Sequence, residues 1–176
     1  SWCATCDGFF FKDKEIAVVG GGDSALEEAL FLTTYASKVY LIHRRDSLRA
    51  SDIMQQRVFD NPKIEVLWNS VVSEIHGDSK LEEIVLTDTV TGATRDMRLD
   101  GLFIAIGSDP RIEMVKDQLE ITDQNTIAVQ GRSSKTSLPG VFAAGDVIDP
   151  TYRQAIIAAG SGAVAALDAQ HYLENL

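Results

Sequence analysis

Two cysteines near the start of the chain, Cys3 and Cys6, have the C-x-x-C spacing of a pair that forms and breaks a disulfide. Zinc binding would require a second such pair, or histidines at ligand spacing, and the 3 histidines are scattered along the chain. We therefore predict a redox-active dithiol and no metal site. Two inert buried thiols are the alternative.

Asp7 directly follows the second cysteine. Reducing a disulfide requires a thiolate that attacks one sulfur and a proton that reaches the departing sulfur. A carboxyl group beside Cys6 is placed to donate or accept that proton, which makes Asp7 a candidate acid/base. A turn or helix-capping role explains the residue about as well.

The segment GGGDSA, from Gly20 to Ala25, fits the pattern G-x-G-x-x-A between an apolar run and a helical pattern. In such turns the first glycine permits a tight turn, Gly22 lets the backbone approach a pyrophosphate, and Ala25 lets the helix pack closely on the strand. The N–H groups at the helix start, around Asp23 and Ser24, then face the anion. Glycine turns also join strands to helices that bind nothing, so this motif needs context.

The context is a basic cluster after the next apolar run: His43, Arg44, Arg45 and Arg49. An NAD site usually has Asp or Glu at this place, to bind the ribose 2′-hydroxyl. Guanidinium groups instead match the oxygens of a 2′-phosphate. We therefore predict that the site takes NADPH and not NADH, the alternative being an ordinary solvated basic face.

The elements that position these residues are read from apolar periodicity. The first part of the chain predicts a strand, helix and strand, then a second helix, three antiparallel strands and a further buried strand. Their ranges are 15–19, 23–35 and 38–42, then 51–59, then 71–76, 81–88 and 93–99, and finally 101–106. The sequence Ser24 to Glu27 also has the form of a capping box.

A domain boundary is predicted near 107–110, where the pattern breaks at Gly-Ser-Asp-Pro. Beyond it we expect a short helix, two strands and a long helix of small residues, at 112–119, 127–129, 141–144 and 154–172. The fold class is thus α/β: a Rossmann-like domain with an antiparallel meander, followed by part of a second dinucleotide-type domain.

Composition limits the partners. The 176 residues include 26 acidic and 16 basic side chains, a formal net charge of −10. Such a surface repels phosphate backbones, so we expect no nucleic-acid and no membrane partner. With no membrane-spanning run and no signal-peptide pattern, we expect a soluble cytoplasmic protein.

Taken together, the segments CATCDG, VVGGGDSALEEALFL, HRRDSLRAS, GLFIAIG and GVFAAGDVIDPTYRQAIIAAGSGAVAALDA resemble bacterial low-molecular-weight thioredoxin reductase over essentially the whole chain. The resemblance implies a homodimeric flavoenzyme that passes electrons from NADPH through FAD to a dithiol and then to thioredoxin. It implies an NADPH-binding domain with the cysteine pair at 1–108, and the carboxy-terminal part of a split FAD domain at 109–176.

The resemblance also assigns individual roles. Cys6 would lie next to the flavin, and Cys3 would attack the thioredoxin disulfide with Asp7 as acid/base. The turn residues Gly20, Gly22, Ser24 and Ala25 would hold the NADPH pyrophosphate. The remaining assignments concern the 2′-phosphate (Arg44, Arg45, Arg49) and FAD (Gly145, Asp146, Val147, Arg153, Gln154, Ala155). Without the other matching segments, Gly145 and Asp146 would be interpreted as a strand-ending turn, and the last helix as an ordinary core helix.

One departure from the family pattern stands out: the chain has a single glycine fingerprint, and it belongs to NADPH. In the family, the FAD fingerprint precedes the C-x-x-C pair. We therefore expect this chain to be part of a longer one, lacking half of the FAD domain, with hinge linkers near 107–110 and before Ser1. By itself it should bind NADPH but not FAD, and it should not turn over. The alternatives are a reductase that feeds a peroxiredoxin and a non-catalytic NADPH-binding module.

Overall fold

The computed structural model describes all residues, from Ser1 to Leu176. They form two compact units, Ser1–Gly107 and Ser108–Leu176, which are described separately. Unit 1 ends at Gly107, whose φ of 98° lies in the left-handed region that favours glycine.

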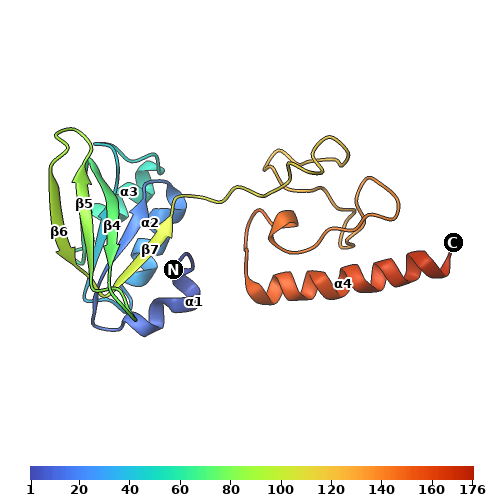
Figure 1. Ribbon diagram of the computed structural model, residues 1–176, viewed down its shortest axis with the longest axis horizontal. Helices are drawn as coiled ribbons and strands as arrows, with labels where there is room; N and C mark the ends of the chain where they lie inside the picture. Colours follow the sequence, from blue (N-terminus) through green and yellow to red (C-terminus); the bar gives the residue numbers. More distant parts are fainter. The chain divides into compact units, whose positions relative to one another are not determined.

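The centre of unit 1 is a parallel four-stranded sheet (Figure 1). Its strand order is β3-β2-β1-β7, and every neighbouring pair is parallel. The strands are β1 (Glu15–Gly20), β2 (Lys38–Ile42), β3 (Ile64–Leu67) and β7 (Gly101–Ala105). The carboxyl ends of all four strands therefore lie along one edge.

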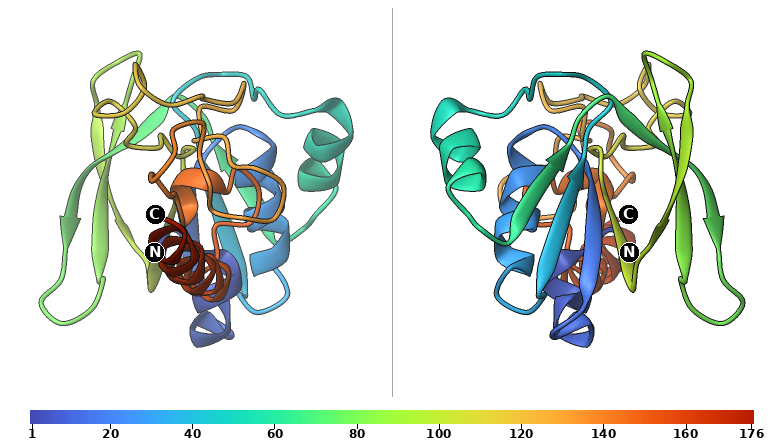
Figure 2. Two further views of the ribbon diagram at one scale, coloured as in Figure 1. Left: turned by 90° about the vertical axis from the view of Figure 1, so that its right-hand side faces the viewer. Right: turned by 90° about the vertical axis from the view of Figure 1, so that its left-hand side faces the viewer.

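Helices cover one face of this sheet and an antiparallel meander covers the other (Figure 2). The helices are α1 (Ala4–Asp7), α2 (Asp23–Leu32) and α3 (Asp52–Phe59), with a 3₁₀ helix, η1 (Gly8–Phe11), after α1. The meander consists of β4 (Ser70–His76), β5 (Glu83–Asp88) and β6 (Thr94–Arg98), in the order β4-β5-β6.

Because successive side chains of a strand point to opposite faces, β1 supplies both cores of this unit. Ile16 and Val18 pack with the helices, whereas Ala17 and Val19 pack with the meander. The fully buried Phe103 of β7 adds an aromatic ring to the helix side. Because both faces of the sheet are packed against other elements, the ends of its strands are held in place.

The predicted α/β fold with an antiparallel meander is confirmed, with corrections. The strand β3 was not predicted, because it has only four residues and is defined by its pairing with β2. Helix α2 ends at Leu32, three residues earlier than predicted, in a turn that runs to Tyr35. The capping box is wrong, since the N-cap is Gly22 and no side chain caps this helix.

Unit 2 contains a short 3₁₀ helix, η2 (Asp146–Ile148), and the long helix α4 (Ala155–Glu174). Its small core includes Ile112, Leu119, Ile127 and Ala143. The carboxylate of Asp168 on α4 accepts two hydrogen bonds of 2.8 Å, from the amide and the hydroxyl of Ser134, and these bonds lower the pKa of Asp168. α4 itself has no buried residue.

Three predicted elements of unit 2 are wrong. Residues 112–119 form turns instead of a helix, and the strands at 127–129 and 141–144 are reduced to single bridges, Ile121–Ile127 and Lys135–Phe142. Within this chain neither segment finds a partner long enough for a ladder. No helix of either unit combines the length and apolar character that a membrane crossing requires.

Candidate functional site

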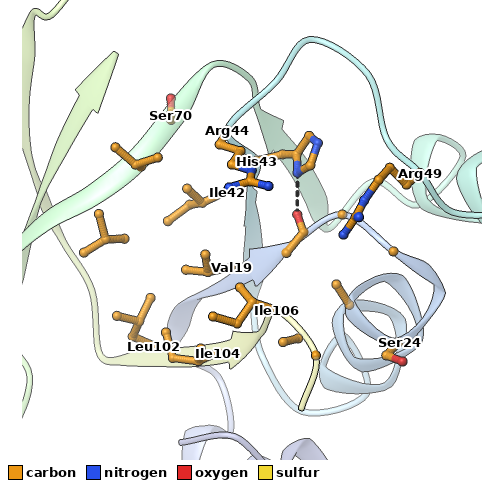
Figure 3. A pocket seen from close by; sticks show the side chains of 18 of the residues that line it. Val19, Ser24, Ile42, His43, Arg44, Arg49, Ser70, Leu102, Ile104 and Ile106 are labelled. Atoms are coloured by element: carbon orange, nitrogen blue, oxygen red, sulfur yellow. Dashed lines mark hydrogen bonds between the residues drawn. The ribbon is translucent and has the colours of Figure 1, made fainter. Parts of the chain in front are cut away.

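A cavity of about 780 Å³ opens at the carboxyl edge of the parallel sheet in unit 1 (Figure 3). This is the position at which open α/β sheets bind ligands. One side is polar, made by the turn after β1 and the loop after β2, and the other side is apolar. The apolar side includes Val19, Ile42, Val72, Leu102, Ile104 and Ile106.

The glycine turn forms the polar floor of the cavity, but its glycines are required for different reasons. A Cβ on Gly20 would lie 2.5 Å from both the Ala105 carbonyl oxygen and the Ala25 Cβ. A Cβ on Gly22 would meet nothing within 4 Å. None of the three glycines has a positive φ. Gly20 therefore allows strand and helix to pack closely, and Gly22 leaves space in which a ligand can approach the backbone.

Helix α2 begins directly after this turn, with Asp23 and Ser24 in the cavity wall. The start of a helix presents N–H groups and a partial positive charge to an anion. Since the N-cap residue of α2 is Gly22, no N-cap side chain competes with a ligand for that position. Ala25 is completely buried and keeps the helix close to β1.

The loop from His43 to Ser51, here called the arginine loop, is fastened to the glycine turn. The Gly21 carbonyl accepts hydrogen bonds from the amides of Arg49 (2.7 Å) and Ala50 (3.2 Å). The Asp23 carboxylate accepts from the Ser51 amide (2.9 Å) and hydroxyl (2.7 Å), and these bonds lower the pKa of Asp23. The structure thus gives Asp23 a contact within the protein, and the two polar parts of the site form one hydrogen-bonded unit.

The arginines differ in their positions. Arg44 and Arg49 line the cavity, as Figure 3 shows, whereas Arg45 is exposed and is not among the lining residues. The Arg45 carbonyl accepts a hydrogen bond from the Asn69 amide, which fixes its backbone beside the start of β4. The structure therefore brings two of the three predicted guanidinium groups to the cavity.

His43 is 6% exposed and stands at the end of β2. Its ring nitrogens lie 2.9 Å from two carbonyl oxygens, Nδ1 from that of Gly20 and Nε2 from that of Ser47. A Cβ on Gly21 would lie 2.2 Å from the His43 Cε1 atom, so the middle glycine makes room for this ring. His43 lines the cavity with its side chain occupied by the protein.

Cys3 and Cys6 form a disulfide, with their Cα atoms 5.2 Å apart. Cys3 is the N-cap of α1 and Cys6 lies within this helix, and the Cys6 amide donates a hydrogen bond of 3.2 Å to the Cys3 sulfur. Asp7 is half-buried and makes no capping hydrogen bond to η1, so the capping interpretation of this residue finds no support.

The cysteine segment is attached to the cavity through β7. The Ser1 amino group donates to the Leu102 carbonyl, and the Ile104 amide donates to the Ser1 carbonyl, both at 2.8 Å. Leu102 and Ile104 also line the cavity. The cysteines do not line the cavity, so β7 contacts both the cysteine segment and the cavity while the two predicted sites stay separate.

A second cavity, of about 390 Å³, lies within unit 2. It contains three of the residues predicted to bind FAD, namely Asp146, Val147 and Arg153. The Arg153 amide donates to the Asp149 carboxylate at 2.8 Å, and its guanidinium contacts the Ser108 hydroxyl. The other three, Gly145, Gln154 and Ala155, adjoin these residues in sequence but do not line the cavity.

Sequence reasoning missed the residues that join the two polar parts of the nucleotide site. Gly21 occupies a variable position of the motif G-x-G-x-x-A, and Ser51 stands at the start of the predicted helix 51–59. The apolar wall was also missed, although Leu102, Ile104 and Ile106 alternate along the predicted strand 101–106. Because successive side chains of a strand point to opposite faces, this spacing places the three side chains on one face, and it is the one signal that the sequence offers.

These features define the class: a parallel α/β dinucleotide-type domain with a glycine turn, an arginine loop and a C-x-x-C disulfide. Residues 1–162 match the family described as pyridine nucleotide-disulphide oxidoreductase. The chain belongs to this family.

Its relatives are named thioredoxin reductases. One from Streptomyces clavuligerus is 60% identical over the whole chain, which covers 55% of that protein, and thioredoxin reductase 2 of Arabidopsis thaliana is 53% identical over 100% of the chain and 47% of its own length. The crystal structure of thioredoxin reductase from Streptococcus pyogenes superposes on 100% of this chain and 57% of that one, with a TM-score of 0.90 and 47% identity. The chain thus spans about half the length of its relatives.

Proposed function

We propose that the chain is the NADPH-binding and dithiol-bearing part of a thioredoxin reductase. The single observation that carries the proposal is the joined glycine turn and arginine loop, which face one cavity in the same compact unit as the Cys3–Cys6 disulfide. The names of relatives at 52–60% identity support thioredoxin as the substrate.

The residues of unit 1 fit the nucleotide. The open space beside Gly22 and the uncapped start of α2 suit the pyrophosphate, and Arg44 and Arg49 supply charged donors for a 2′-phosphate. Arg45 is proposed as an outer contact to the same phosphate. The apolar wall of the cavity suits the uncharged rings of the nucleotide.

The dithiol completes the activity. Converting the Cys3–Cys6 disulfide into two thiols takes two electrons and two protons: the hydride of NADPH accounts for both electrons and one proton, and one further proton comes from solvent or an acid. The two thiols are reoxidised to the disulfide when they pass the two electrons and two protons to the thioredoxin disulfide. Bound FAD would supply the electron transfer between NADPH and the disulfide. We assign Cys3 the attack on thioredoxin, Cys6 the position next to the flavin, and Asp7 the transfer of the proton.

We place part of the FAD site in unit 2, at the cavity that holds Asp146, Val147 and Arg153. Its mixed acidic and basic lining suits hydroxyl and phosphate groups of the flavin nucleotide. Gly145, Gln154 and Ala155 are proposed as neighbouring contacts. A homodimer and a cytoplasmic location complete the proposal by family analogy.

The thiol step is testable on this chain without a flavin. The chain is reduced chemically, freed of reductant and mixed with oxidised bacterial thioredoxin, and the redox state of both proteins is followed by mass spectrometry after thiol alkylation. We expect thioredoxin to gain two thiols as the chain regains its disulfide. Cys3→Ser and Cys6→Ser variants should each be unable to complete the exchange. If the wild-type dithiol left thioredoxin oxidised but reduced a peroxiredoxin system, thioredoxin would be the wrong substrate.

A further inference from the structure

Trp2 stands directly before the redox pair and is the most exposed aromatic side chain of the chain, with 84% of its surface accessible. The other tryptophan, Trp68, is partly buried and packs against the helix side of the core. An indole is a large apolar group, and leaving it in water forgoes the burial that usually stabilises aromatic residues. Packing within unit 1 therefore gives little reason for a tryptophan at this position.

The backbone on both sides of Trp2 is fixed. The Ser1 amino and carbonyl groups are hydrogen-bonded to β7. The Cys3 amide donates a hydrogen bond of 3.1 Å to the Ser1 hydroxyl, and the Cys3 sulfur is held by the disulfide to Cys6. The exposed indole is thus presented from an ordered main chain, so a partner that covers it has little backbone left to immobilise.

Trp2 also lines an apolar groove of about 570 Å³ on unit 1. Ile75 of β4 and Leu102 and Ile104 of β7 line the same groove, and 62% of the Ile75 surface is accessible. Lys14 lies at this groove as well. Accessible apolar surface therefore continues from the indole along the strand to which the cysteine segment is attached.

The chemistry of the cysteine pair determines what approaches Trp2. In the proposed exchange, the Cys3 thiolate attacks one sulfur of the substrate disulfide, a mixed disulfide forms, and the departing sulfur takes a proton. The Cys6 thiolate then attacks the Cys3 sulfur, which restores the Cys3–Cys6 disulfide and releases the second substrate sulfur to become a thiol. Two electrons and two protons thus pass from the chain to the substrate.

The mixed disulfide limits the distance between the two molecules. The Cα atoms of disulfide-bonded cysteines are at most about 6.8 Å apart, and consecutive Cα atoms are about 3.8 Å apart. The substrate cysteine therefore comes within about 11 Å of the Trp2 Cα atom. A folded substrate carries flanking residues that contact the indole at this distance, whereas a small disulfide has none.

We propose that Trp2 is a specificity-determining residue for the disulfide substrate: its indole packs against the segment of thioredoxin that flanks the attacked disulfide. Tryptophan is among the residues that contribute most binding energy at protein interfaces. This inference rests on the proposed function, and it adds the residue that distinguishes a folded protein disulfide from a small one.

The first experiment compares two substrates of the chemically reduced 176-residue chain, oxidised thioredoxin and oxidised glutathione, by the second-order rate constant of each exchange. Trp2→Ala should slow the reduction of thioredoxin by about tenfold or more, the cost of removing a central interface aromatic, and leave that of glutathione unchanged. Trp2→Phe should lie between. The matched control is Tyr152→Ala, which removes a 67% exposed aromatic side chain from unit 2 and should equal the wild type with both substrates.

The second experiment locates the indole in the mixed disulfide. The Cys6→Ser chain, which lacks the cysteine that resolves the mixed disulfide, is joined through Cys3 to a single-cysteine thioredoxin and, separately, to glutathione. Oxidation of Trp2 by hydroxyl radicals is then measured by mass spectrometry. We expect strong protection of Trp2 in the thioredoxin conjugate and none in the glutathione conjugate.

The outcomes are distinguishable. If the wild type reduces glutathione but not thioredoxin, the proposed function fails and this inference fails with it. If the wild type reduces thioredoxin, but Trp2→Ala does so equally fast and Trp2 stays open to oxidation in the conjugate, only the role of Trp2 is overturned. Equal slowing with both substrates would also overturn it, because Trp2 would then act on the cysteine pair and not on the partner.

Discussion

Removing the two guanidinium groups that line the cavity, in the double variant Arg44→Ala/Arg49→Ala, should abolish most of the selectivity for NADPH. A hydrogen bond to a charged group contributes about 1.5–3 kcal/mol. Because both arginines are exposed in this structure, we take the lower end of this range for each. At about 1.4 kcal/mol per factor of ten, each substitution should cost about tenfold in NADPH affinity, and both together about a hundredfold.

The assay is calorimetric titration of the chain with NADPH and with NADH, at one fixed ionic strength because salt screens exposed charges. NADH lacks the 2′-phosphate, so its affinity should change far less. Arg95→Ala, which removes a positive charge from exposed β6, controls for net charge and should change neither affinity. Arg45→Ala should have a smaller effect than Arg44→Ala or Arg49→Ala. Equal losses for NADPH and NADH in the double variant would refute the 2′-phosphate pocket.

Three further predictions concern the glycine turn, FAD and Asp168. Gly22→Ala should have a thermal stability near that of the wild type but bind NADPH more weakly, and unchanged NADPH affinity would contradict the assignment of the turn. Gly20→Ala should lose about 1–3 kcal/mol of stability, because its new methyl group would overpack the contact with Ala105 and Ala25. FAD titrated into the chain should give no saturable yellow complex after gel filtration, and a tight one would show that the flavin site is sufficient here. The hydrogen bonds from Ser134 lower the pKa of Asp168, so its carboxylate should protect the Ser134 amide from hydrogen exchange above about pH 4, the ordinary pKa of an aspartate, and this protection should be lost as the pH falls through the lowered pKa. In Asp168→Asn the Ser134 amide should be much less protected at neutral pH. If the difference in protection between the wild type and Asp168→Asn stayed constant with pH, the protection would not depend on the ionisation of Asp168.

The sequence was sufficient for those parts of the fold whose causes are local. The apolar runs that became β1, β2 and β7 are long enough to be buried on both faces, and the glycine turn marks where α2 begins. β3 has only four residues, Ile64–Leu67, and is defined by its pairing with β2. Its existence depends on a neighbour that local patterns do not reveal.

Unit 2 shows the same limit more strongly. The apolar segments near Ile127 and Phe142 have strand-like composition, but each finds only a single bridge in this chain. The segment near Ile112 makes successive turn hydrogen bonds to Val115 and Lys116 without continuing as a helix. Composition gave the propensity of these segments, and the partners available to them decided the outcome.

For the candidate site, residue types predicted the chemistry, whereas only the structure shows which of these residues face the cavity. Three arginines in the pattern are equivalent as charges, yet the backbone of the loop directs Arg44 and Arg49 to the cavity and leaves Arg45 outside its lining. In the same way, the pattern implied that Gly20 serves a tight turn, whereas its need is close packing on Ala105 and Ala25. Such distinctions depend on tertiary distances.

A crystal structure of the chain with NADP⁺ is the decisive test of the proposed nucleotide site. We expect the pyrophosphate beside Gly22 at the start of α2, and the 2′-phosphate within hydrogen-bonding distance of the Arg44 and Arg49 guanidinium groups. A nucleotide bound elsewhere, or one whose 2′-phosphate points into solvent away from both arginines, would show that the glycine turn and the arginine loop do not form the NADPH site.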